Sequence, residues 1–373
     1  MADAAGTRVA VLFGGRSVEH EVSVRSASTV VEALRAGGFE PVPVGVTHHG
    51  RWRTGEAARR MLEGRPDPAA TAGEFLLVPD PAFRGLAGPG PDGGWVGLPV
   101  DVVFPLIHGI HGEDGTLQGL LDLAEIPYVG SGVGASALGM DKRLQRRLFR
   151  EEGLPTLPTA EVERRRWEAD PAGEEGRALE TVGLPCFVKP NRSGSSVGVS
   201  KVKEASGLGA AIGLAARYDG IILVERAVDA REIECAVLGN LEPEASGLGE
   251  IVPGREFYDY RAKYLEDTSE LRVPAPVASA QEDRVRELAR AAFLALGCSG
   301  LARVDFFLER GSGEVWLNEI NTLPGFTSIS MYPRLWAEAG VPLPALVVRL
   351  VELGRERFAD RARNRMSYEG EPR

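Results

Sequence analysis

Residues 303–325 read R-V-D-F-F-L-E-R-G-S-G-E-V-W-L-N-E-I-N-T-L-P-G and contain two short β-rich runs. Because side chains alternate along a strand, Arg303 and Asp305 share one face of the first run, and Glu319 shares one face of the second with Asn321. Two carboxylates and an amide are oxygen ligands that suit Mg²⁺ or Mn²⁺, which leave positions open for phosphate oxygens. A neighbouring arginine suits a reaction that develops negative charge. The alternative is a hairpin whose acids are solvated or salt-bridged.

The first part of the chain alternates strands and helices. Residues 8–13 predict a buried strand, the glycines at 14–15 turn the chain, and Ser17 could cap a helix that ends at Gly37 and Gly38. The same alternation predicts further elements at 42–46, 101–107 and 116–125. Such a pattern indicates a parallel α/β sheet.

The rest of the chain is predicted to be α+β. Strands are expected at 186–189, 197–202 and 221–225, and helices at 205–217, 281–296 and 343–357. A second α+β unit starts near residue 233 and holds a polar loop at 254–276. Residues 47–98 show weak periodicity and include the Gly/Pro cluster 85–94, which we interpret as a surface insertion.

Composition limits the possible functions. A chain of 373 residues should form two or three domains, and its net charge of −10 argues against a general nucleic-acid partner. The three cysteines, Cys186, Cys235 and Cys298, form no C-x-x-C pair, which favours a reducing compartment. We find neither a signal peptide nor an apolar run long enough to cross a bilayer. We therefore expect a cytoplasmic protein without a membrane partner.

Two glycine-containing motifs could bind anions or substrates. K-P-N-R-S-G-S-S-V-G begins at Lys189 and could cradle phosphates with backbone N–H groups, although a flexible hairpin turn explains it equally well. It is not a Walker A loop. In F-G-G-R-S-V-E-H-E-V-S, Glu19 and Glu21 lie in a first helical turn, where the helix dipole alone favours acids. That structural explanation suits Glu19, whereas Glu21 could hold a cationic amine.

Three further motifs are weaker when taken alone. In H-G-I-H-G-E-D-G, His108 and His111 have a metal-like spacing, but a polar loop that contacts substrate is the better interpretation. In I-L-V-E-R-A-V, Glu225 ends a strand and could face adenine, and Glu232 beyond it could accept ribose hydroxyls. The tyrosine-rich Y-D-Y-R-A-K-Y at 258–264 lies in a loop, where such residues either serve function or pack beneath the loop.

Together these motifs resemble the D-alanine–D-alanine ligase family of the ATP-grasp superfamily. The matching runs include G-G-R-S-V-E-H-E-V-S, H-G-x-x-G-E-D-G-T-L-Q-G, V-K-P-x-R-x-G-S-S-V-G, F-Y-D-Y-x-A-K-Y and E-x-N-T-x-P-G-F-T-x-x-S, in the family's order from residue 14 to 331. The resemblance implies a three-domain ATP-grasp fold of α/β and α+β class. Its parts would be an N-terminal parallel α/β domain (1–142, insertion about 47–98), a central subdomain (143–229) and a C-terminal subdomain (230–373, lid loop 254–276).

The resemblance also implies roles for single residues. ATP would contact Lys142, Lys189, Glu225, Val228, Glu232 and Lys263. Two Mg²⁺ or Mn²⁺ would be held by Asp305, Glu319 and Asn321. The catalytic group would be Glu21, Ser195, Tyr264, Arg303, Gly325 and Ser330. The first D-alanine would lie near Glu21 and His108, the second would be positioned by Ser330 and Met331, and the oxyanion would face Arg303 and the N–H of Gly325.

The implied activity is the ATP-dependent joining of two D-alanines through an acyl phosphate, for peptidoglycan precursor synthesis. The implied assembly is a homodimer, and activation by a monovalent cation such as K⁺ stays open. Alternatives are a D-alanine–D-lactate ligase, another ATP-grasp carboxylate–amine ligase, or a non-catalytic nucleotide-binding scaffold. The scaffold would tolerate loss of metal ligands, yet all three are present. Family members that choose D-lactate typically have a lid histidine, and residues 254–276 contain none.

Overall fold

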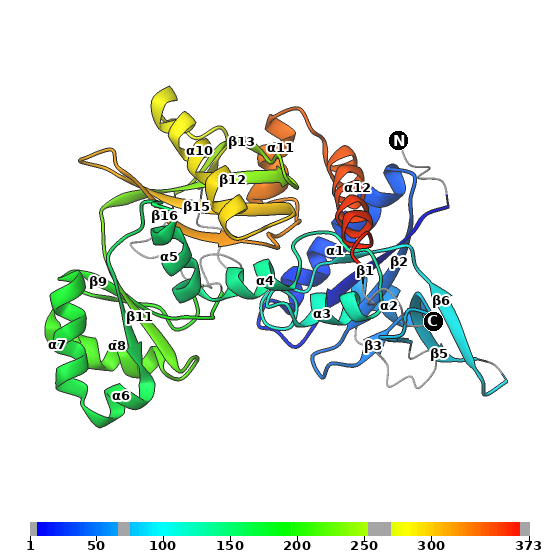
Figure 1. Ribbon diagram of the computed structural model, residues 1–373, viewed down its shortest axis with the longest axis horizontal. Coiled ribbons are helices and arrows are strands. Elements are labelled where there is room, and N and C mark those ends of the chain that lie inside the picture. Colours follow the sequence, from blue (N-terminus) through cyan, green and yellow to red (C-terminus); the bar gives the residue numbers. More distant parts are fainter. Residues whose placement is uncertain (1–5, 66–74, 91, 195, 253–269, 366–373) are drawn as a thin grey trace.

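The computed structural model describes residues 6–65, 75–90, 92–194, 196–252 and 270–365 (Figure 1). Within these residues the strands form four sheets, with orders β3-β2-β1-β7, β4-β5-β6, β10-β9-β11-β8 and β14-β13-β12-β15-β16. In the described part of the chain, no helix combines the length and apolar character needed to cross a membrane.

The first sheet is parallel at its centre, as the sequence predicts. β1 (Arg8–Gly14) pairs in parallel with both β2 (Glu40–Val46) and β7 (Val102–Pro105), and the short β3 (Trp52–Arg53) turns back against β2. α1 (His20–Ala36) packs against β1. It begins later than predicted, because Ser17 accepts a hydrogen bond from Glu19 N (3.1 Å) in the preceding turn and does not cap the helix.

The described residues between 47 and 98 form more regular structure than an insertion of weak periodicity suggests. They contain α2 (Gly55–Leu62) and a small antiparallel sheet of β4 (Leu76–Leu77), β5 (Gly85–Pro89) and β6 (Trp95–Pro99). The expectation of a surface segment is wrong for the start of the Gly/Pro cluster, where four residues of β5 are buried. Its small residues allow close approach: a Cβ on the first glycine would stand 2.6 Å from Leu98 O.

Three helices connect the β3-β2-β1-β7 sheet to the β10-β9-β11-β8 sheet. α3 (Thr116–Leu123) agrees with the predicted helix, whereas α4 (Val133–Met140) and α5 (Lys142–Glu151) were not assigned from the sequence. Asp141 caps α5 by accepting a hydrogen bond from Leu144 N (3.0 Å). A capped α5 presents its first two turns to the sheets that follow.

The central sheet is antiparallel throughout and carries helices on one side. Its strands are β8 (Thr159–Glu163), β9 (Cys186–Pro190), β10 (Ser200–Val202) and β11 (Ile221–Arg226). α7 (Pro171–Val182) and α8 (Leu208–Ala215) contribute Ala178, Val182, Leu208 and Ile212 to its core. The short α6 (Arg164–Ala169) packs on α7, and a 3₁₀ turn (Ala205–Gly207) precedes α8.

The C-terminal sheet holds the two strands quoted first. Its members are β12 (Ala230–Gly239), β13 (Glu244–Val252), β14 (Glu270–Arg272), β15 (Gly300–Glu309) and β16 (Val315–Asn321), with α10 (Ser279–Ala295) packed against them. β15 and β16 are antiparallel, with Arg303 opposite Asn321 and Asp305 opposite Glu319. The register confirms that the four predicted side chains belong to one paired face.

The last helices return to the N-terminal sheet. α11 (Met331–Glu338) and α12 (Leu343–Arg361) share a buried core with α1, and Figure 1 shows red α12 beside blue α1. Phe326, fully buried before α11, meets Phe104 of β7 edge-on with ring centroids 5.7 Å apart. This core anchors the loop between β16 and α11 against the first sheet.

Candidate active site

A chain of ion pairs connects α5 to the C-terminal sheet. Lys142 Nζ lies 3.1 Å from Glu319 Oε2 and donates a hydrogen bond to Ser193 O at 3.0 Å. Burial alone would raise the pKa of Glu319, but Lys142, Lys189 and Arg303 outweigh burial and lower it to about 2. Glu319 therefore stays an anion at any physiological pH, as a ligand for a cation must.

Glu225 is almost wholly buried and forms the next two ion pairs of the network. Lys189 Nζ lies 3.1 Å from its Oε2, and Arg146 Nη2 forms a second, very short contact with the same oxygen. Burial would raise the pKa of Glu225, but Arg146 and Lys189 lower it overall. Burial lowers the pKa of Lys189 more than Glu225 raises it. In this conformation Glu225 pairs with two cationic side chains, those of Arg146 and Lys189.

Arg303 is held by two carboxylates. Its guanidinium forms a two-pronged contact with Asp305, at 2.7 and 2.8 Å, and its Nε lies 3.1 Å from Glu234 Oε2. Burial would lower the pKa of Arg303, but Asp305 and Glu234 raise it well above the ordinary value. Sequence analysis missed Glu234, although its alternation with Glu232 along β12 could have indicated it.

His108 lies in a polar cluster between the first sheet and the loop after β16. Its Nε2 is 3.3 Å from Ser26 Oγ, and its Nδ1 is 3.2 Å from Leu323 O and 3.4 Å from Glu113 Oε1. Burial would lower the pKa of His108, but Glu113, Glu19 and the Leu323 carbonyl raise it overall. Ser26 Oγ also accepts from Phe326 N at 3.2 Å, so the cluster joins α1 to that loop.

The two acids at the start of α1 face different surroundings. Glu19 Oε2 stands 3.3 Å from the position a Cβ on Gly194 would take, and 3.1 Å from the equivalent position on Gly109. The side chain of Glu21 is 69% exposed and pairs with His48. Glu19, which the sequence explained by the helix dipole alone, is thus the acid beside the Gly/Ser-rich turn.

The loop between β16 and α11 is held by Ser330. Its Oγ accepts a hydrogen bond from Thr327 N at 3.0 Å and lies 2.8 Å from Thr327 Oγ1. A Cβ on Gly325 would stand 2.9 Å from the same Oγ, so a side chain there would collide with Ser330. Met331 begins α11 and is buried. Asn321 Oδ1 accepts from Leu323 N (3.0 Å), which turns the chain at the strand end.

Other expected site residues lie near the connection from β11 to β12, and some fall outside the described residues. Val228 is half-buried in the connection from β11 to β12, and Glu232 is half-buried on β12 opposite Phe307. Ser195, Lys263, Tyr264 and the lid residues 254–269 lie outside the described residues. Their implied roles stay predictions.

Two family models cover most of the chain. The one described as D-ala D-ala ligase N-terminus matches residues 8–131, and the one described as D-ala D-ala ligase C-terminus matches residues 148–352. The chain belongs to the D-alanine–D-alanine ligase family. This confirms the resemblance that the motifs indicated.

Full-length relatives and solved structures agree with this family. D-alanine–D-alanine ligases of Heliobacterium modesticaldum and Geobacillus kaustophilus are 48% and 43% identical, covering 95% and 98% of this chain and 96% and 100% of theirs. The Coxiella burnetii D-alanine–D-alanine ligase superposes with a TM-score of 0.83 at 34% identity over 96% of this chain and 97% of its own. VanG, a D-Ala:D-Ser ligase from Enterococcus faecalis, gives 0.83 at 36% over 94% and 99%. The ATP-grasp fold expected for this ligase family is confirmed.

The ligase family implies a divalent cation, and the residues present fit one. Asp305 and Glu319 stand opposite each other across β15 and β16, and Asn321 ends β16. Their donors are all oxygen, and in this conformation the two carboxylates are neutralised by Arg303 and Lys142. An oxygen-only ligand set that includes the ionised carboxylate of Glu319 is suited to Mg²⁺ or Mn²⁺.

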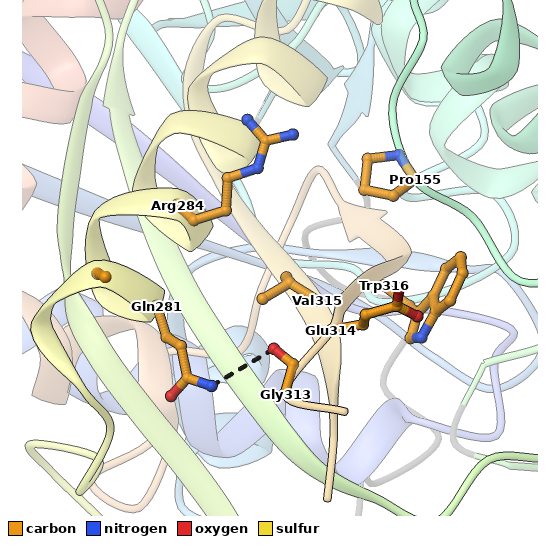
Figure 2. Close-up of a pocket in the computed structure, with 8 residues that line it drawn as sticks. Pro155, Gln281, Arg284, Gly313, Glu314, Val315 and Trp316 are labelled. Atoms are coloured by element: carbon orange, nitrogen blue, oxygen red, sulfur yellow. Dashed lines mark hydrogen bonds between the residues drawn. The ribbon is translucent and has the colours of Figure 1, made fainter. Parts of the chain in front are cut away.

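A surface pocket of about 360 Å³ shares none of its lining residues with this network of ion pairs. It is formed by Pro155, the start of α10 and the β15–β16 turn, where Gln281 Nε2 donates to Gly313 O at 3.4 Å (Figure 2). Among the described residues, none of the expected site residues lines it, so this pocket and the expected site are separate in their residues.

The neighbouring arginines of α5 allow a matched test of the buried ion pair. Arg146 pairs with Glu225, both almost wholly buried, whereas Arg147 pairs with Glu161 and is 58% exposed. Arg146→Met should lower the free energy of unfolding by about 3–5 kcal/mol, nearer the lower value because Lys189 still faces Glu225. Arg147→Met should cost at most about 1 kcal/mol. Urea denaturation of both variants checks this, and equal losses would contradict it.

Proposed function

We propose that the protein joins two D-alanine molecules to D-alanyl-D-alanine while ATP is converted to ADP and phosphate. Relatives at 43–48% identity over nearly the whole chain carry that name. The observation that carries the proposal is the alternation of Lys142, Lys189 and Arg303 with acids at the meeting of α5, β9 and β15. Such a site can accept phosphates and metal ions by exchanging partners within the network.

The first step needs an activated carboxylate. A carboxylate is a poor electrophile, and transfer of the γ-phosphoryl group from ATP converts it to an acyl phosphate with a good leaving group. Lys142 and Lys189 would screen phosphate charges that otherwise repel the attacking carboxylate. Mg²⁺ or Mn²⁺ held by Asp305, Glu319 and Asn321 would supply further neutralisation of phosphate charge.

The second step develops an oxyanion. The neutral amine of the second D-alanine attacks the acyl carbon, and negative charge grows on the carbonyl oxygen before phosphate leaves. Arg303 would stabilise that charge, because Asp305 and Glu234 hold its guanidinium in place. We assign the N–H of Gly325 to the same oxyanion, and Ser330 and Met331 to the second D-alanine.

We assign the ammonium group of the first D-alanine to Glu19 and not to Glu21. Glu19 lies beside Gly194 and raises the pKa of buried His108, which places its charge at the inner side of the α1 turn. Glu21 is directed towards His48 and solvent. His108 would lie near the same substrate, and we keep Glu225, Val228 and Glu232 as the adenosine side of the ATP site.

The proposed setting follows from the substrates. D-alanyl-D-alanine is a peptidoglycan precursor, and ATP is supplied in the cytoplasm, so we propose a cytoplasmic enzyme. A homodimer is proposed on the family resemblance alone.

The product distinguishes the proposed ligase from its nearest alternatives. With equal D-alanine, D-lactate and D-serine in the presence of ATP and Mg²⁺, mass spectrometry should find D-alanyl-D-alanine predominant at about pH 6 and pH 8. Amide formation should rise with pH, because the attacking amine must be neutral. Predominant ester at the lower pH would indicate a D-lactate enzyme, and predominant D-alanyl-D-serine would indicate the activity named for VanG.

The two acids on either side of His20 provide a paired test of the ammonium site. Glu19→Gln should raise the KM for the first D-alanine at least tenfold, because a neutral amide loses the attraction to the ammonium group. Glu21→Gln should stay within about threefold of wild type, since an exposed charge contributes at most about 1 kcal/mol. Steady-state kinetics decide between them, and the opposite ranking would return the assignment to Glu21.

The metal assignment predicts a loss of turnover in Glu319→Gln. Removing this charge should lower kcat by more than about 10², since it weakens neutralisation of the transferring phosphoryl group. Raising the Mg²⁺ concentration should restore part of the activity. Turnover within a few-fold of wild type at moderate Mg²⁺ would contradict the assignment, and circular dichroism serves as the folding control.

A further inference from the structure

A second set of metal-ligating side chains lies outside the oxygen ligands of β15 and β16. His20 and Glu21 open α1, and His48 lies in the turn between β2 and β3. Among the described residues, each of these three offers a ligand atom within 4.8 Å of the other two. None of them has a role in the proposed ligase chemistry.

His20 is oriented as a metal-binding histidine is. It is buried, and its Nδ1 lies 2.8 Å from Gly15 O. A carbonyl oxygen only accepts, so Nδ1 donates and Nε2 is the nitrogen left for a ligand. Metal-bound histidines almost always donate their other ring N–H in this way. A Cβ on Gly14 would stand 2.9 Å from His20 Cε1, so the ring packs tightly on that glycine.

His48 is brought to this ring by a closed turn. Thr47 N donates to Arg51 O at 2.9 Å, and Gly50 N donates to Thr47 O at 2.8 Å. The His48 and His20 rings are stacked, with centroids 3.7 Å apart and planes 23° from parallel. The turn therefore holds the His48 ring next to the buried His20 ring.

Glu21 completes the group. Its Oε1 lies 3.5 Å from His48 Nε2. Two ligand atoms about 2.1 Å from one tetrahedral zinc ion lie ~3.4 Å apart, so this spacing needs no backbone movement. Both side chains are exposed, at 61% for His48 and 69% for Glu21. A metal ion lies in the plane of each imidazole that binds it, so the exposed His48 ring rotates out of its stack on His20 when both bind one ion. The buried His20, whose Nδ1 is already paired with Gly15 O, adds a third ligand in a fixed orientation.

We propose that His20, Glu21 and His48 bind one divalent transition-metal ion of the Zn²⁺ class, with water as a further ligand. Two imidazoles and one carboxylate suit such ions, whereas the oxygen-only set at Asp305 and Glu319 suits Mg²⁺. A bound ion joins the β2–β3 turn to the start of α1. Because Glu19 is the N-cap residue of α1, the ion stabilises the N-terminal side of the site without taking part in the reaction.

The test is a titration of the EDTA-treated full-length protein with ZnCl₂ by calorimetry, in excess Mg²⁺. Wild type should bind one equivalent of zinc through this site. His48→Ala should weaken zinc binding at least tenfold, whereas His49→Ala, which alters the adjacent exposed histidine of the same turn, should not. Zinc should raise the thermal unfolding midpoint of wild type and His49→Ala but not of His48→Ala.

Two controls separate this site from the proposed ligase site. Glu319→Gln should keep the zinc affinity, and His48→Ala should keep Mg²⁺-dependent ligase turnover and the unfolding midpoint of the metal-free protein. Co²⁺ should give a tetrahedral visible absorption spectrum that is lost in His48→Ala. Equal zinc affinity in wild type and His48→Ala, no binding at all, or zinc binding lost in Glu319→Gln would overturn the proposal.

Discussion

The alternating ion pairs around Glu319, Glu225 and Arg303 are the constraint on which the rest of the structure depends. A buried charge is tolerated only when an opposite charge meets it. Here the opposite charges come from α5, β9 and β12, which belong to separate parts of the chain. The central sheet and the C-terminal sheet must therefore dock in one arrangement for every charge to be matched. The same charges would serve the proposed binding of phosphates and cations, since a ligand can replace a protein partner of equal sign.

Backbone register and a shared core fix the remaining geometry. The antiparallel pairing of β15 with β16 sets Asp305 opposite Glu319, and the ladder shifts just after Asp305. The loop that follows β16 is held from the other side, because Phe326 packs between Phe104 and Tyr332 in the core shared with α1 and α12. A loop fixed at both ends suits the role proposed for the N–H of Gly325, because donors fixed in advance need no reorganisation during the reaction.

The molecule offers two cation environments of different chemistry. On β15 and β16 the proposed ligands are oxygen atoms already neutralised by lysine and arginine, which favours an ion that brings phosphate with it. At the start of α1 they are two imidazoles and one carboxylate, with one ring fixed by Gly15 O. The two environments differ in the hardness of their ligands. The oxygen set would therefore select Mg²⁺ and the imidazole set Zn²⁺ when both ions are present.

The sequence by itself determined the strand faces of 303–321, the parallel first sheet and the order of the motifs, because alternation and turn residues are local properties of the chain. It did not reveal Glu234, the Arg146–Glu225 pair or the difference between Glu19 and Glu21. Arg146 and Glu225 are 79 positions apart, and Ser26 and Phe326 are 300 apart. Contacts of that separation leave no periodic trace in the sequence. Only the tertiary structure decided which acid faces Gly194 and which faces His48, because packing between segments turns neighbouring side chains to opposite surroundings.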